Sequence, residues 1–213
     1  MKSKISILLI ILIVSLSNIG IVHAESSLEP GVYFVQKEGN VDDSWIIKAE
    51  IEYRKIPKEI REDFEKNSNG EIFVTDKDLA KEYGFKYNIM GIYTEKKKHY
   101  EGSEEILWYQ GTIKVEDREE AMTALIHEIG HYIDYTHDTI SETEEFKGIK
   151  AEEVGELAYY FKPNKGNYKN TEEYFAESFK YYILEPEELE KRCPKTFRYI
   201  DKIVKSYSKE IIK

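Results

Sequence analysis

The chain has 213 residues, of which 41% are hydrophobic, and a formal net charge of −10. This length suffices for one domain with a sizeable core, and the acidic balance argues against nucleic-acid binding because negative surfaces repel phosphate. Cys193 is the single cysteine, which excludes an internal disulfide. No base is visible near it in the sequence, so a buried structural thiol is expected.

The N-terminal segment has the three parts of a secretory signal peptide. Lys2 and Lys4 provide the positive start, Ile5 to Val14 form an apolar stretch, and Val22-His23-Ala24 is a small-residue cleavage site. The apolar stretch falls short of the roughly 20 residues that a membrane span needs. We therefore expect cleavage of residues 1–24, a secreted extracellular domain over residues 25–213, and no stable membrane insertion afterwards.

Short apolar segments in the first half of the chain predict a small sheet. Strands are expected at residues 32–35, 45–53, 71–74, 89–94 and 106–109. The second of these shows loose alternation of apolar residues. Helices are expected from Pro57 to about Asn67, and from a cap at Asp76 to Gly84. Lys96-Lys97-Lys98 is expected in a solvated loop or turn between the last two strands.

The second half of the chain has helical periodicity. Cap signals predict helices that begin near Asp117, Ser141, Asn170 and Pro194. Each of the first three is followed three residues later by a glutamate, as in a capping box. The first covers the apolar run 121–135, and the third is expected to end near Leu184. Strands followed by helices predict an α+β fold, with a small mixed sheet and a helical C-terminal half.

The stretch His127-Glu128-Ile129-Gly130-His131 carries the chemistry of the first of these helices. Residues four apart share a helix face, so His127 and His131 can offer two imidazole nitrogens to one tetrahedral Zn²⁺. Glu128 can then reach a water at the metal without acting as a ligand. This arrangement of two ligands and one general base is typical of zinc metalloproteases and predicts one zinc ion per chain. The alternative is a pair of ordinary histidines on an amphipathic helix.

A catalytic zinc site usually has a third protein ligand. His137 has the metzincin spacing, but Asp134 stands where that pattern has glycine, and no methionine follows. We therefore interpret His137 as a surface or helix-end histidine. Glu173 and Glu177 share a helix face, so one can ligate zinc while the other bonds an imidazole. Glu172 is a further candidate for the third ligand. A closed site with four protein ligands, including His137, would be a structural zinc site.

Five segments carry a resemblance to a known family. They are Gly91-Ile92-Tyr93, Ile106-Leu107-Trp108, residues 127–131 followed by Asp134, residues 173–179 and residues 194–197. In this order they resemble the catalytic domain of anthrax lethal factor and the small secreted Pro-Pro endopeptidases of the same family. The resemblance implies a monomeric, zincin-like (gluzincin) metalloendopeptidase that acts on protein or peptide substrates, with its zinc site in the helical half. A role in virulence and cleavage near proline are the expectations to test.

The resemblance also implies roles for single residues. Glu173 becomes the third zinc ligand, Glu128 the general base, and Glu177 and Asp134 support the ligands. A tyrosine upstream of the third ligand stabilises the oxyanion in the family. Tyr168 is the nearest match, although its spacing from Glu173 is shorter than the family's. Tyr159 and Tyr160 lie further upstream.

The resemblance places Ile106, Leu107 and Trp108 at the sheet edge that receives the substrate as an added strand. Trp108 could equally belong to the core. The chain has no clear counterpart of the Gly-Trp loop of the Pro-Pro endopeptidases, so their specificity does not carry over. Two other functions are considered, a metzincin-type protease that uses His137 and a non-enzymatic secreted binding or toxin-accessory protein.

Overall fold

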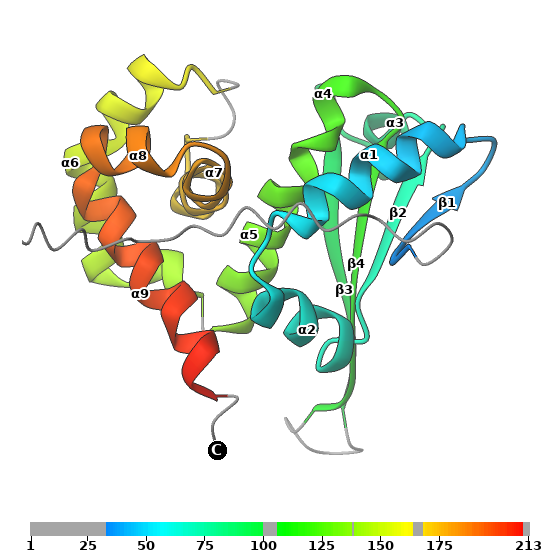
Figure 1. Ribbon diagram of the computed structural model, residues 1–213, viewed down its shortest axis with the longest axis horizontal. Coiled ribbons are helices and arrows are strands. Elements are labelled where there is room, and N and C mark those ends of the chain that lie inside the picture. The colour runs from blue at the N-terminus through cyan, green and yellow to red at the C-terminus, as the bar shows by residue number, and fades with distance from the viewer. Residues whose placement is uncertain (1–32, 100–105, 138, 164–167, 211–213) are drawn as a thin grey trace, which may run out of the picture. The chain divides into compact units, whose positions relative to one another are not determined.

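The first half of the chain forms a small mixed sheet, and the second half is helical (Figure 1). The computed structural model describes residues 33–99, 106–137, 139–163 and 168–210, so the expected signal peptide lies outside the described residues. The strands are β1 (Val35–Glu38), β2 (Glu71–Thr75), β3 (Gly91–His99) and β4 (Ile106–Glu116). Their order is β1-β2-β4-β3, in which β1, β2 and β4 are parallel and β3 is antiparallel to β4. The expected α+β class with a small mixed sheet is confirmed.

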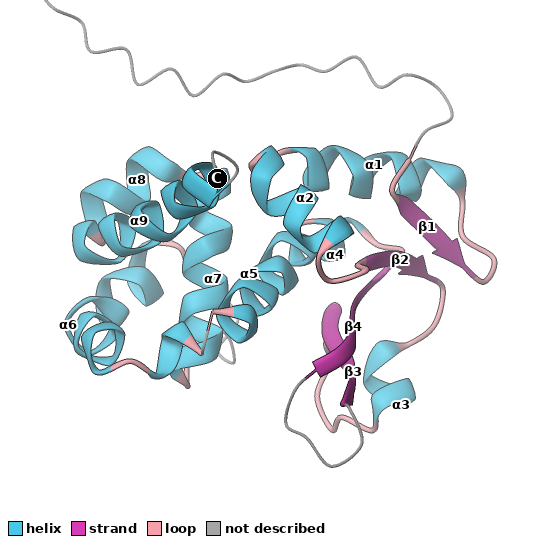
Figure 2. Ribbon diagram, turned by 90° about the horizontal axis from the view of Figure 1, so that it is seen from below, coloured by secondary structure: helices cyan, strands magenta, loops and turns pink. Residues whose placement is uncertain are grey.

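Helix α5 (Ala124–Thr136) lies between the sheet and the C-terminal helices in both views (Figures 1 and 2). The other helices are α1 (Asp43–Arg54), α2 (Lys58–Lys66), α3 (Leu79–Tyr83), α4 (Glu119–Met122), α6 (Glu144–Tyr160), α7 (Thr171–Leu184), α8 (Pro186–Arg192) and α9 (Pro194–Glu210), with a 3-10 turn at Ile140–Glu142. Within the described ranges, no helix is both long and apolar enough to cross a membrane.

One buried apolar cluster joins the sheet to α5 and to the C-terminal helices. Ile72 on β2 and Ile113 on β4 belong to the same buried cluster as Leu125 and Ile129 on α5. Phe175 on α7 belongs to this cluster as well. Burying each such side chain contributes about 1.5–3 kcal/mol, so α5 is held on two sides by apolar contacts. The polar side chains of α5 are therefore held in fixed positions.

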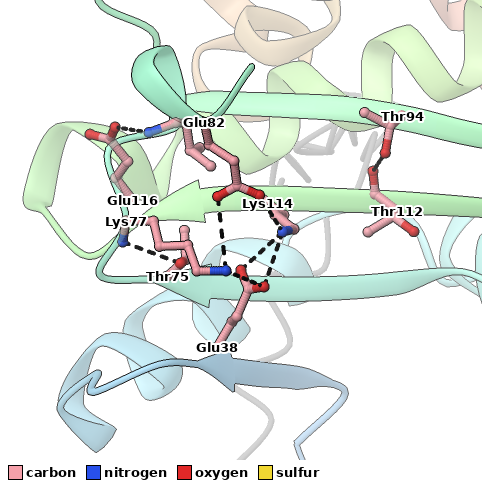
Figure 3. Close-up of polar contacts among 9 residues, drawn as sticks. Glu38, Thr75, Lys77, Glu82, Thr94, Thr112, Lys114 and Glu116 are labelled. Carbon is pink, nitrogen blue, oxygen red and sulfur yellow. Dashed lines mark hydrogen bonds and ion pairs between the residues drawn. The ribbon is translucent and has the colours of Figure 1, made fainter. Parts of the chain in front are cut away.

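The face of β4 opposite the core carries an ion-pair network (Figure 3). Lys114 alternates with buried neighbours, so its side chain lies on the other face of the sheet. Its Nζ atom lies 3.0 Å from Oε2 of Glu38 on β1 and 3.0 Å from Oε1 of Glu82 on α3. Lys77 contacts the same Glu38 at 2.8 Å. The network ties α3 and β1 to the central strand on the side away from α5.

The strand expected at residues 45–53 is wrong, because this segment is helix α1. Asp42 caps the helix by accepting a hydrogen bond from the Ser44 amide at 2.8 Å. Ala49 and Tyr53, one turn apart, are buried, whereas Ile47 and Ile51 are exposed. Apolar residues therefore lie on both the buried and the exposed face of this helix. Together they gave the alternating pattern that is typical of a strand.

Five further local expectations need correction. Lys96-Lys97-Lys98 lies in β3 and not in a loop, and Lys97 pairs with Glu95 at 2.6 Å. The caps at Asp76, Asp117 and Ser141 are displaced: the structure has Asp78, Arg118 and Thr143 as N-caps instead. The expected strand at residues 32–35 corresponds to β1, which begins at Val35. The displacements of the caps are small. They arise because tertiary contacts, and not cap chemistry alone, fix where an element begins.

Candidate metal centre

Two helices, α5 and α7, supply the residues of the candidate metal centre. The N-cap predicted at Asn170 is confirmed, because its side chain accepts a hydrogen bond from the Glu173 amide at 2.8 Å. This cap starts α7 so that Glu173 lies in its first turn and Glu177 one turn later. Tyr174 and Phe175, next to Glu173, are buried and hold the helix against the core.

Gly130 brings the two helices together. A Cβ atom at this position would lie only 2.7 Å from Cα of Ala176. Real Cβ atoms do not approach backbone this closely, so a larger residue would push α7 away from α5. The glycine between the two histidines of the motif therefore serves the close helix contact, and that contact brings Glu173 to the histidines.

The histidine and glutamate side chains converge on one point. Nε2 of His127 lies 3.3 Å from Oε2 of Glu173, and Nε2 of His131 lies 3.6 Å from Oε1 of the same carboxylate. The three candidate ligand atoms all lie within 4.8 Å of one another. Two ligand atoms at about 2.1 Å from a shared tetrahedral ion lie about 3.4 Å apart. The observed spacings fit a zinc ion held by these three residues.

The charges around this cluster favour a cation. Burial opposes protonation of His127, but the carboxylates of Glu173 and Glu177 outweigh it and raise the pKa of His127 to about 10. Burial likewise opposes ionisation of Glu173, but its bonds to His127 and His131 hold the pKa of the Glu173 carboxyl well below its usual range. A site that stabilises a proton on a buried imidazole in this way also suits a metal ion.

Glu177 holds one of the imidazoles from behind. Its Oε2 atom lies 2.9 Å from Nδ1 of His127, and its other oxygen contacts Nζ of Lys180. Burial by itself would raise the pKa of Glu177, but His127 and Lys180 lower it to about 2. An ionised Glu177 accepts a hydrogen bond from Nδ1–H of His127, so that Nε2 of the same ring faces Glu173.

Glu128 lies on the other side of α5, against strand β3. It is buried, and a Cβ atom at Gly91 would come within 2.9 Å of its Oε1 atom. Burial raises the pKa of Glu128, and the nearby imidazoles of His127 and His131 partly oppose this. Gly91 thus leaves space for the carboxylate on the β3 side of the cluster.

Comparison with known proteins identifies the family. The family model for the N- and C-terminal domain of anthrax toxin lethal factor matches residues 11–203 of the chain. The chain belongs to this family. The sequence motifs show a resemblance to this family from Gly91 onwards, and the family model extends it over most of the chain.

Among solved structures, this chain is similar to the Pro-Pro endopeptidase PPEP-2 from Paenibacillus alvei. The two share 19% sequence identity and a TM-score of 0.57, over 80% of this chain and 97% of the other. At this identity the likeness shows a shared fold. No curated protein matches the chain.

His137 and Asp134 lie near the centre without joining it. His137 ends α5, and its ring packs against Tyr207 of α9 at a centroid distance of 5.0 Å. It is not part of the ligand cluster found among the described residues. Asp134 is buried and accepts a hydrogen bond from the Ser141 amide at 2.7 Å, which fixes the turn after α5.

The tyrosines considered for the oxyanion lie in different places. Tyr168 lies just before α7 and is partly buried against the core, so its oxyanion role stays a prediction. Tyr159 and Tyr160 are exposed near the end of α6. The guanidinium of Arg192 lies 3.6 Å from the ring centroid of Tyr160, which places that tyrosine in a surface contact.

The strand expected to receive the substrate has different neighbours along its length. Ile106, Leu107 and Trp108 begin β4, which pairs with β3 at these residues and with β2 only from Thr112 to Glu116. Among the described strands, the start of β4 thus has a neighbour on one side only, and its role in substrate binding stays a prediction. The outer strand beside α5 is β3, and the side chains of residues 106–108 lie outside the described part of the structure.

Two residues at the site were missed as functional residues. Gly91 was part of a matching segment, but only its contact with Glu128 reveals its role. Tyr135 lies one turn after His131, and its ring stacks on both His131 and Tyr93, at centroid distances of 6.2 and 6.0 Å. Helical spacing from His131 could have identified Tyr135, whereas the contact with β3 needed the fold.

Proposed function

We propose that the chain is a zinc-dependent metalloendopeptidase with a zincin-like site of the gluzincin type. His127, His131 and Glu173 would hold one Zn²⁺ per chain, and Glu128 would act as the general base. The observation that carries this proposal is the convergence of three ligand atoms within 4.8 Å of one another, with a buried carboxylate next to them. Family membership and the shared fold with PPEP-2 support peptide-bond hydrolysis as the reaction.

A bound zinc ion would supply Lewis acidity, which lowers the pKa of water from 15.7 towards roughly 7 and polarises the substrate carbonyl. Glu128 takes the proton of the attacking water and later passes it to the leaving amine. Its burial raises its pKa, which favours this exchange near neutral pH.

We further propose that Tyr168 donates a hydrogen bond to the developing oxyanion. Its position three residues before α7 and its partial burial next to the core support this role. The change Tyr168→Phe should lower kcat about 10²-fold and leave zinc affinity unchanged. Tyr160→Phe is the control and should leave kcat unchanged, because the Tyr160 ring lies in a surface contact with Arg192. Equal kcat values for Tyr168→Phe and wild type would contradict the role.

The substrate would bind as an added strand along β3. Among the described strands, β3 lies at one edge of the sheet and β1 at the other, and Glu128 lies against Gly91 at the start of β3. Main-chain hydrogen bonds along such an edge give affinity without strict sequence preference. PPEP-2 is named a Pro-Pro endopeptidase, so peptides with proline around the cleaved bond are the first substrates to test.

We propose that residues 1–24 are a cleaved signal peptide and that the remaining domain acts outside the cell as a monomer. The charge pattern of Lys2 and Lys4 before the apolar stretch supports this. Mass spectrometry of the protein from the culture medium should give an N-terminus at Glu25. Retention of the intact N-terminus in the cell fraction would contradict it.

The central experiment compares wild type with Glu128→Ala. Both proteins should contain one zinc by elemental analysis, and only wild type should cleave a peptide library or casein. Chelation should abolish wild-type cleavage, and added zinc should restore it. Wild-type rates in Glu128→Ala would overturn the mechanism. Full zinc content without any cleavage by wild type would favour the alternative of a non-enzymatic binding protein.

A further inference from the structure

Lys180 is placed where it can act on the metal centre without touching it. It follows Glu177 by one turn on α7, and its Nζ atom contacts Oε1 of that glutamate. The other oxygen of Glu177 lies 2.9 Å from Nδ1 of His127. The three side chains therefore form a continuous chain from a lysine through a carboxylate to an imidazole.

The burial of this chain makes the lysine contact important. The side chain of Glu177 is 0% exposed, and that of Lys180 is 16% exposed. A carboxylate buried in this way depends on its polar partners, and the contact with Lys180 adds to the one with His127. Lys180 supplies the compensating positive charge, and its oxygen contact restricts how the Glu177 carboxylate can turn.

A second pair with the same spacing shows that the burial is not a property of the sequence pattern. Glu188 and Lys191 on α8 also lie three residues apart, with an Oε2–Nζ distance of 3.4 Å. Their side chains are 38% and 61% exposed. Exposed pairs contribute little because water screens them. Glu188 also pairs with Arg192 at 2.7 Å, so Lys191 serves as the control for loss of a surface lysine at the same spacing from a glutamate.

We propose that Lys180 is a positioning residue of the metal centre: it orients the Glu177 carboxylate so that His127 presents Nε2 to the cation. This inference rests on the proposed zinc site. Lys180 acts through Glu177, so its effect requires that carboxylate. Replacement of a residue that holds a metal ligand from behind typically weakens metal affinity 10–100-fold. Lys180 is one contact further away, so we expect a loss of about ten-fold for its replacement.

The test measures zinc affinity by competition with a fluorescent chelator. Lys180→Met removes the charge and keeps the apolar stem, Lys180→Arg keeps the charge, and Lys191→Met is the matched control on α8. We expect about ten-fold weaker zinc binding for Lys180→Met, near wild-type binding for Lys180→Arg, and no change for Lys191→Met. If Lys180→Met does not fold, Lys180→Gln takes its place in each comparison.

A double-mutant cycle with Glu177→Gln separates positioning from a general effect on folding. If Lys180 works through Glu177, Lys180→Met should change zinc affinity less than two-fold once Glu177→Gln is present. An equal loss in both backgrounds, or wild-type affinity in Lys180→Met alone, would overturn the proposal. Absence of zinc binding by the wild-type chain would overturn the proposed function as well, so the two failures are distinguishable.

Discussion

The two sides of helix α5 differ in how they hold chemical groups. On the side of α7 the helices approach so closely that Gly130 has no room for a Cβ atom, and Glu177 is fully buried between His127 and Lys180. On the side of β3 the contact is with a strand at the sheet edge, and Tyr135 beside it is 42% exposed. One helix thus faces a dry interface and an accessible one.

This difference separates two tasks. Metal ligands must be held within narrow limits, which suits an interface of close-packed backbone and paired charges. A substrate strand needs access, which suits the edge of a sheet. The histidines follow the same division: Nδ1 of His127 is fixed by Glu177, whereas Nδ1 of His131 is buried without a hydrogen-bond partner among the described residues. We therefore expect substitutions on the α7 side to affect zinc and stability, and substitutions on the β3 side to affect turnover.

The largest effect is expected for Glu173→Gln. Loss of one of three charged or imidazole ligands should weaken zinc affinity by about 10³-fold or more, because the amide is a poor zinc ligand. Glu172→Gln is the matched control, since Glu172 is the neighbouring acid and lies outside the ligand cluster. Chelator competition measures both. Equal zinc loss in the two variants would mean that the wrong glutamate has been assigned.

Gly130→Ala tests the dry side of α5. The new Cβ atom would lie 2.7 Å from backbone of α7, so a helix must shift, and we expect a loss of about 2–3 kcal/mol in the free energy of unfolding. Gly155→Ala in α6 is the control, because no atom lies within 4 Å of its Cβ position. This change should stabilise the protein by about 0.5–1 kcal/mol through helix propensity. Urea unfolding measures the free energy of unfolding of both variants. A wild-type value for Gly130→Ala would contradict the close contact.

Gly91→Ala tests the accessible side. Its Cβ atom would lie 2.9 Å from Oε1 of Glu128, which is the end of a side chain and can move away. Stability should therefore change by less than about 1 kcal/mol, while displacement of the base should lower kcat about ten-fold or more. Zinc affinity should stay at the wild-type value. A variant that loses zinc but keeps its turnover per bound zinc would show that the two sides of α5 are not separate.

The smallest effect is expected at Cys193, remote from both sides in sequence. The prediction of a buried thiol is confirmed, since Cys193 is 0% exposed. Burial raises its pKa to about 12, so the reactive thiolate is scarce at every pH well below that value. The folded protein should not react with a thiol reagent at pH 8, and unfolding in urea should restore the reaction. Rapid labelling of the folded protein would contradict this.

Much of the candidate site followed from local patterns. The His127–His131 spacing is set by the helix itself, and Asn170 is the N-cap that the sequence indicated for α7. The wrong strand at residues 45–53 shows the limit of such patterns. Ile47 and Ile51 are apolar but face solvent, so the sequence alone could not tell which face of that segment is buried.

The sequence by itself determined the spacing of the two histidines, the adjacent glutamate, the order of sheet and helices, and the start of the helix that carries Glu173. These depend on residues within a few positions of one another. Only the tertiary structure decided which acid meets the histidines, which strand forms the edge, and that Lys180 supports Glu177. The reason is physical: the close approach of α5 and α7 at Gly130 and the placing of β4 inside the sheet join residues far apart in the chain, and no local periodicity reports such contacts.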